Sequence, residues 1–227
     1  MKTFLAIAVL LPGLLAAADD LEKLRDKQDR PGLEKAALAL QAAAEKAPSA
    51  DAWYKAAIAQ SYAAEVAMEQ RDKPGSQRQA ESGVRDMEKG IALNNKTGDY
   101  YRVLGTLCGQ VIPANPIAGI LSYGKRAKDA LEKAIAMDPK SAKAHIARGV
   151  GNYYLPANFG GGPDQAIADF QQAISLDPKN AEAYLWLGMA QNKKKAVPQA
   201  REAFQKSLQL NADRIWTKQQ LDKLPPQ

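Results

Sequence analysis

Residues 181–212 read AEAYLWLGMAQNKKKAVPQAREAFQKSLQLNA, two helical patterns separated by a short polar stretch. The second pattern has earlier counterparts in residues 166–178, AIADFQQAISLDP, and residues 127–139, AKDALEKAIAMDP. Small and apolar residues recur in each segment at the spacing of one helix face. The Asp-Pro that closes the two earlier segments stops a helix and turns the chain. The sequence therefore predicts an internal repeat of helical hairpins.

This repeat resembles the tetratricopeptide repeat (TPR), a helix-turn-helix unit of about 34 residues with the pattern W-x2-L-G-x2-Y, A-x3-F and P. The last unit matches it at these positions: Tyr184, Leu187, Gly188, Gln191, Ala200 and Phe204, with Ala212 in place of proline. The two units before it match less fully, and weaker units extend the resemblance over residues 21–212. The resemblance implies an all-α, right-handed α-solenoid. A helix near residues 213–224 is expected to cap it, because repeat arrays need a polar end.

The repeat units are expected within residues 19–227 and end near residues 48, 95, 139, 178 and 212. The first three steps between these ends exceed the TPR length, and the excess lies between the two helices of a hairpin. Enlarged loops are therefore expected along one edge of the solenoid. Residues 51–72 and 77–93 are predicted as long helices, a further helix is predicted to begin near Asn115-Pro116, and residues 155–163 (LPANFGGGP) are predicted as a loop.

Three glycines occupy the eighth position of a unit: Gly105, Gly149 and Gly188. At this position of a TPR the two helices of a hairpin cross. Small side chains at a crossing let the backbones approach closely. We therefore expect these glycines to face Ala127, Ala166 and Ala200 on the second helices.

Residues 1–18 have the features of a secretory signal peptide: a basic start, an apolar stretch and the small residues Ala16-Ala17-Ala18. The apolar stretch is shorter than the roughly 20 residues needed to span a bilayer, although an N-terminal membrane anchor is the alternative. No cysteine follows it for the lipid attachment of bacterial lipoproteins. The sequence therefore predicts a periplasmic or secreted protein.

The composition argues against a catalytic or metal site. The chain has one histidine and one cysteine, which leaves no pair for a zinc site, a disulfide or a His-based dyad. His145 is expected to be a half-buried packing residue, and Cys108 a buried thiol or, alternatively, half of an intermolecular disulfide. Residues 119–125 match G-x4-G-K but lack the Ser or Thr of a phosphate loop. We expect no enzyme, metal or cofactor.

The net charge is +6, and the basic residues are scattered among acidic ones along the chain. This pattern is typical of a solvated helix surface and not of a nucleic-acid-binding stripe. The sequence predicts no nucleic-acid partner.

In TPR proteins the first helices line a concave groove, so the resemblance implies which residues face a partner. The implied groove residues are Lys55, Tyr62, Arg102, Lys143, Ile146, Tyr153, Leu185 and Met189. Their mixed basic and apolar character suggests an extended peptide or a partner helix with acidic groups. The predicted function is therefore that of an exported scaffold which binds a protein or peptide.

The enlarged loops suggest a second contact edge. Two segments in them, Ile112-Pro-Ala-Asn115 and Leu155-Pro-Ala-Asn158, have nearly the same sequence. The exposed residues there would be Asn115, Tyr154, Asn158 and Phe159. The alternative is two similar corners in which asparagine caps backbone groups. The Asn-Phe-Gly-Gly corner also resembles that of periplasmic TPR subunits of TRAP-type transporters. That similarity implies the alternative function, a small-ligand-binding subunit associated with a transporter.

Overall fold

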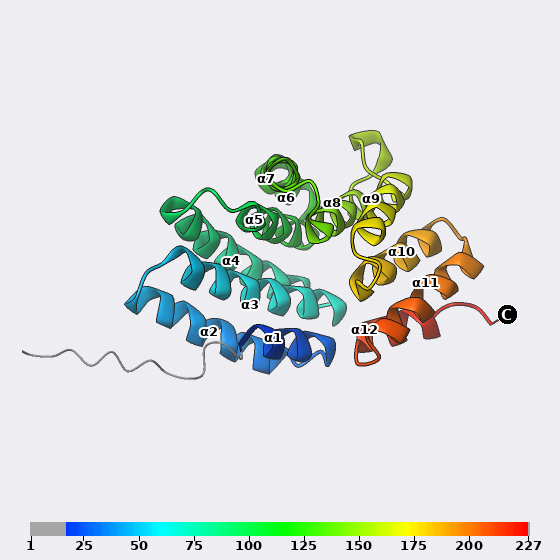
Figure 1. Ribbon diagram of the computed structural model, residues 1–227, viewed down its shortest axis with the longest axis horizontal. Coiled ribbons are helices and arrows are strands. Elements are labelled where there is room, and N and C mark those ends of the chain that lie inside the picture. Colours follow the sequence, from blue (N-terminus) through cyan, green and yellow to red (C-terminus); the bar gives the residue numbers. More distant parts are fainter. Residues whose placement is uncertain (1–16, 227) are drawn as a thin grey trace, which may run out of the picture.

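The computed structural model describes residues 17–226, which form only helices, turns and loops (Figure 1). The helices in chain order are α1 (Ala17–Asp26), α2 (Arg30–Lys46), α3 (Ala50–Glu69), α4 (Lys73–Leu93), α5 (Gly98–Val111), α6 (Pro116–Gly119), α7 (Lys125–Met137), α8 (Ala142–Tyr154), α9 (Pro163–Leu176), α10 (Ala181–Lys193), α11 (Val197–Leu210) and α12 (Ile215–Asp222). Short 3-10 turns follow α5 (Ile112–Ala114) and α8 (Ala157–Phe159), and a π-helical turn (Ile120–Gly124) joins α6 to α7.

The helices pack in successive pairs and form the all-α TPR-like solenoid that the sequence predicts. The pairs are α1 with α2, α3 with α4, α5 with α7, α8 with α9, and α10 with α11, and α12 packs on the last pair. The array curves so strongly that α12 lies beside the ends of α1 and α3 (Figure 1). The first helices α3, α5, α8 and α10 therefore surround an interior space.

Polar side chains fix the helix starts. Ser49 and Ser141 accept hydrogen bonds through Oγ from the backbone N of Ala52 (3.1 Å) and Ala144 (3.2 Å). Asn180 accepts through Oδ1 from the backbone N of Ala183 at 3.3 Å. Each satisfies a backbone donor that has no partner within the first turn of the helix. These caps fix the register in which each hairpin presents its apolar face.

The crossing glycines lie where the sequence predicts, and the structure sharpens the reason. A Cβ on Gly188 would lie 2.6 Å from Cδ1 of Phe204 and 3.1 Å from the carbonyl oxygen of Ala200. A Cβ on Gly149 would lie 2.5 Å from Cε1 of Phe170. A Cβ on Gly105 would lie 2.6 Å from Cγ of Leu131. The side chain that fills each crossing is thus the residue four positions after the expected alanine, a phenylalanine in the last two units and a leucine in the one before, and only glycine leaves room for it.

The predicted boundaries of two inserts need correction. α3 ends at Glu69, and α4 already begins at Lys73, so Pro74 and Gly75 belong to the first turn of α4 instead of a linker. Proline is well placed there because the first-turn N–H groups have no helical partner. The predicted loop at 155–163 contains one 3-10 turn, and its last residue, Pro163, is the first residue of α9.

The N-terminal segment is described only in part. Residues 1–16 of the predicted signal peptide lie outside the described residues, and Ala17 begins α1. Among the described helices, none combines the length and the apolar character needed to cross a bilayer.

Candidate functional site: a cavity inside the superhelix

The interior space is a cavity of about 1470 Å³. Its walls come from α3, α5, α8 and α10, from α1, and from the segment that ends in α12. The segments after α5 and α8 form part of its rim through Pro113, Leu155 and Phe159, and the π-helical turn before α7 contributes Ile120. Both ends of the chain therefore contribute to one site.

A polar group occupies the wall where α3 and α5 begin. Arg102 donates from Nη2 to Oδ2 of Asp99 at 3.0 Å, and the hydroxyl of Tyr54 donates to the same carboxylate. Burial alone would raise the pKa of Asp99, but the hydrogen bond and charge of Arg102 outweigh it and hold the pKa below its usual range. The guanidinium of Arg102 is thus committed to a structural pair, although it faces the cavity.

Aromatic side chains form the opposite wall. The ring centroid of Trp186 lies 6.1 Å from that of Tyr154 and 5.3 Å from that of Trp216. Tyr154 is 52% exposed, and Phe159, on the loop after α8, is 64% exposed. Large aromatic surfaces that remain accessible in a cavity are typical of binding sites.

The structure brings five of the eight predicted groove residues to the cavity: Lys55, Tyr62, Arg102, Lys143 and Ile146. The other three pack into the C-terminal apolar cluster, where Leu185 is fully buried and Tyr153 and Met189 are partly buried. These three side chains pack between the helices of this cluster and do not line the cavity. Glu182 and Trp186 face the cavity from α10 instead.

Of the four residues predicted for the loop edge, two line the cavity and two do not. Tyr154 and Phe159 line the cavity. Asn158 is exposed in the turn Ala157–Phe159. Asn115 is the N-cap of α6 and accepts through Oδ1 from the backbone N of Ala118 at 3.4 Å. Asn115 and Asn158, which end the two similar segments, therefore have different local roles.

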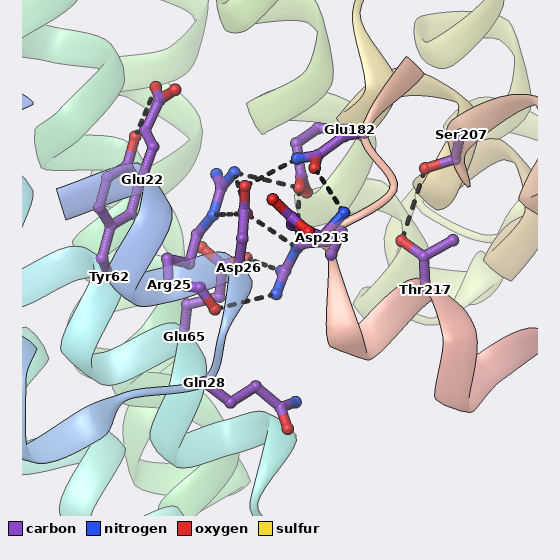
Figure 2. A network of polar contacts seen from close by, with 12 residues as sticks. Glu22, Arg25, Asp26, Gln28, Tyr62, Glu65, Glu182, Ser207, Asp213 and Thr217 are labelled. Carbon is purple, nitrogen blue, oxygen red and sulfur yellow. Dashed lines mark hydrogen bonds and ion pairs between the residues drawn. The ribbon is translucent and has the colours of Figure 1, made fainter. Parts of the chain in front are cut away.

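An ionic cluster joins the two ends of the superhelix beside the cavity (Figure 2). At its centre is Arg214, between α11 and α12, whose side chain has no exposed surface. Its Nη2 donates to Glu65 Oε1 at 2.6 Å and to Glu69 Oε1 at 2.5 Å on α3. Its Nε donates to Glu182 Oε1 on α10 at 2.9 Å. One guanidinium thus binds carboxylates from distant parts of the chain.

The N-terminal helix completes this cluster. Arg25 Nη2 lies 2.8 Å from Asp26 Oδ1 and 3.4 Å from Glu182 Oε1. Asn211 donates through Nδ2 to Asp26 Oδ2 at 2.7 Å. Figure 2 shows Arg25, Asp26 and Glu182 converging from the two ends. Sequence reasoning missed this cluster, because Asn211 and Arg214 stand in a polar turn that resembles any solvated connection.

Burial perturbs the carboxyl groups of the cluster. Desolvation raises the pKa of Glu65 to about 7, although Arg214 and Arg25 oppose the shift. It also raises the pKa of Glu69, against the charge of Arg214. Burial would raise the pKa of Glu182 as well, but Arg214 and Arg25 hold it below its usual range. The carboxylates thus exceed what two arginines can neutralise.

Neither His145 nor Cys108 takes part in the cavity. The His145 ring is buried, with Nε2 3.1 Å from the carbonyl oxygen of Pro139. Cys108 is a free, buried cysteine whose thiol pKa burial raises to about 11. Within residues 17–226 no group of three or more His, Cys, Asp and Glu side chains is placed to hold a metal ion.

Comparison with known proteins identifies two matching regions. The family described as "Regulator of microtubule dynamics protein 1-3" matches residues 14–155, more than half of the chain. A tetratricopeptide repeat family matches residues 159–215. No curated protein matches the chain.

Solved structures show the same fold at low sequence identity. A thermophilic TPR protein of Thermus thermophilus is 18% identical, with a TM-score of 0.59, over 89% of this chain and 98% of that one. The HusA haemophore of Porphyromonas gingivalis is also 18% identical, with a TM-score of 0.57, over 87% of this chain and 94% of that one. The chain is a TPR protein and belongs to the family of regulator of microtubule dynamics proteins 1-3.

Proposed function

We propose that this chain is a non-catalytic scaffold that binds a peptide segment of a protein partner inside its superhelix. The observation that carries the proposal is the cavity of about 1470 Å³ lined by the first helices. Cavities that hold small molecules typically measure about 300–1,000 Å³. The larger volume accommodates several residues of a chain, as expected of a TPR groove.

The two walls favour a partner segment with an acidic and a bulky apolar part. Lys143, in the first turn of α8, is exposed and forms no ion pair with another described residue. Tyr154, at the end of the same helix, belongs to the aromatic wall. Eleven residues at 1.5 Å each separate them by about 16 Å along the axis. A peptide that spans this distance can place a carboxylate at Lys143 and an apolar side chain at Tyr154.

The experiment compares two lysines of neighbouring position. The wild-type chain is used to capture partners from the exported fraction, alongside Lys143→Glu and the matched control Lys140→Glu. Lys140 is exposed and does not line the cavity. We expect Lys143→Glu to lose the captured partner and Lys140→Glu to keep it. Equal capture by both variants would refute binding in the cavity.

A second candidate function is a carrier of an apolar small ligand. It is favoured by the accessible aromatic wall and by the fold shared with a protein whose name states a haem-carrying role. Such a carrier would fit the alternative of a ligand-binding subunit beside a transporter. Native mass spectrometry of the purified chain separates the candidates: a bound small molecule, lost in Tyr154→Ala, supports the carrier, whereas an empty chain with a captured protein supports the scaffold.

The proposal places the protein outside the cytoplasm, after removal of residues 1–18. The supporting observation is the charged and apolar pattern of these residues. N-terminal sequencing of the protein from an exporting host tests it. A mature chain beginning at Asp19 is the expected result, and a chain that retains residues 1–18 in the cytoplasm would contradict it.

A further inference from the structure

The contacts between the two ends of the superhelix differ in kind from those along it. Each apolar cluster of the described residues belongs to neighbouring helices: Leu21, Leu33 and Val66 in the N-terminal cluster, and Trp186 and Trp216 in the C-terminal one. No apolar cluster among residues 17–226 contains residues from both ends. The ends are joined by the ionic cluster around Arg214 and by amide contacts between Gln28 and Gln219.

A polar junction of this kind gives a defined geometry at little net gain in stability. The attraction of buried ion pairs is offset by the cost of removing the charges from water. Here four carboxylates, of Asp26, Glu65, Glu69 and Glu182, face the guanidinium groups of Arg25 and Arg214. The excess negative charge weakens the junction further. Opening it costs much less than separating a hairpin with an apolar core.

The cavity depends on this junction. Leu21 and Glu22 of α1 line it from one end, and Trp216 of α12 lines it from the other. If the ends separate, these walls move apart while each hairpin keeps its own core. An occupant that touches both walls binds the closed form better than the open one, and therefore shifts the chain toward closure.

We propose that the Arg214 cluster is a reversible closure of the superhelix, and that its opening admits the occupant to the cavity. Arg214 acts as a positioning residue because it holds the α1–α3 end against the α10–α12 end. The closed ring is then one of two states of the chain, and the ionic cluster sets their balance.

The titration of the cluster predicts how the balance between the closed and open forms changes with pH. The titratable and charged groups that face Glu65 from other elements are Arg214 from the loop before α12, Arg25 from α1, Glu182 from α10 and Tyr154 from α8. Glu69 and Tyr62 face it from its own helix. At low pH Glu65 is protonated and the excess negative charge is smaller. As the pH rises, Glu65 ionises in a buried position, where desolvation, together with Glu182 and Glu69, outweighs the attraction of Arg214 and Arg25, so the open form, in which Glu65 reaches water, gains population.

The test measures the distance between the two ends on the full-length chain, without any occupant. Spin labels on Lys23→Cys in α1 and Lys218→Cys in α12 report this distance by pulsed electron resonance, since both lysines are exposed. Cys108 stays in place because it is buried and its high thiol pKa leaves it unreactive. We expect Arg214→Met to broaden the distribution and move it to longer distances, with unchanged helicity. Arg78→Met, an exposed arginine of α4, is the matched control.

Three results would overturn the closure. The first is an Arg214→Met distribution identical to that of the wild type. The second, which remains decisive if Arg214→Met does not fold, is a wild-type distribution that stays the same between pH 5 and pH 8. The third is a pH response in Glu65→Gln as large as that of the wild type, where we expect a smaller one because only Glu69 keeps a raised pKa. None of these measurements involves a partner, so they are independent of the outcome of the capture experiments.

Discussion

The α3–α4 hairpin and the α8–α11 repeats cross their helices in the same way but bury different types of side chain. The buried face of α3 consists mainly of alanine, and the six fully buried alanines are Ala56, Ala57, Ala59, Ala63, Ala64 and Ala67. In the C-terminal repeats the fully buried residues include Phe170 and Phe204, supported by Trp186 and Trp216. Alanine allows close contact along the whole helix, whereas an aromatic ring requires a glycine opposite it.

The difference explains why the helices of the two regions differ in length. A methyl group buries little apolar area, so an alanine interface needs many turns to supply the same stabilisation. α3 and α4 have 20 and 21 residues, against 13 for α8 and 14 for α11. We infer that stability is spread evenly through the N-terminal hairpin and concentrated at a few rings in the C-terminal repeats.

The largest expected effect is at one of these rings. Phe204→Ala removes a fully buried aromatic side chain and should lower the free energy of unfolding by about 3–5 kcal/mol. Ala63→Gly in α3 removes one methyl group and should cost about 1 kcal/mol. Urea denaturation of both variants measures the contrast. Similar losses for the two would show that stability is not concentrated as described.

A second prediction adds side-chain volume at the same crossing instead of removing it. Gly188→Leu must displace Phe204 and should cost about 1–3 kcal/mol. Gly109→Leu is the matched control, because a Cβ at Gly109 meets nothing within 4 Å and the residue lines the cavity. Thermal melts should show a loss for the first variant only. An unchanged melting temperature for Gly188→Leu would contradict the crossing.

A third prediction concerns the junction where the two regions meet. The folded-state pKa of Glu65 is about 7, above its ordinary value of 4.5, so the folded chain binds this proton more tightly than the unfolded chain. The resulting stability is complete below pH 4.5 and is lost as the pH rises through 7, on the order of 3 kcal/mol. Urea titrations at pH 5 and pH 8 measure it. Glu65→Gln should reduce the difference to the part that Glu69 contributes, and a wild type that is more stable at pH 8 would show the opposite sign.

The smallest expected effect is at Gly109, and it tests whether the fold of α5 requires a glycine at this position. Gly109 lies within α5, with open space at its Cβ position. Gly109→Ala should therefore raise the free energy of unfolding by about 0.5–1 kcal/mol, because alanine favours the helix. A destabilised variant in a chemical denaturation curve would reveal a contact that the structure does not contain.

The sequence predicted the hairpins well because their signals are local. Gly188 and Phe204 mark a crossing within one unit, and the Asp-Pro pairs mark the ends of α7 and α9. The site was predicted less completely because it depends on the twist summed over all units. The position of Leu185 in its repeat implies the groove, yet its side chain is fully buried in the C-terminal apolar cluster. Arg214 takes the N-cap position that Ser141 and Asn180 hold in the earlier repeats, and nothing in the repeat pattern predicts an arginine there.

The junction at Arg214 also bears on how the molecule melts. In an open array of repeats the terminal units have one neighbour each and fray first, so unfolding spreads inward from the ends. Here the first and last units touch each other as well as their sequence neighbours. Fraying at either terminus must break the ionic cluster, which couples the two termini in a single event. While the closure is intact, the chain should therefore unfold in a more concerted transition than a linear array of the same repeats. Once the closure has opened, the two ends should fray separately.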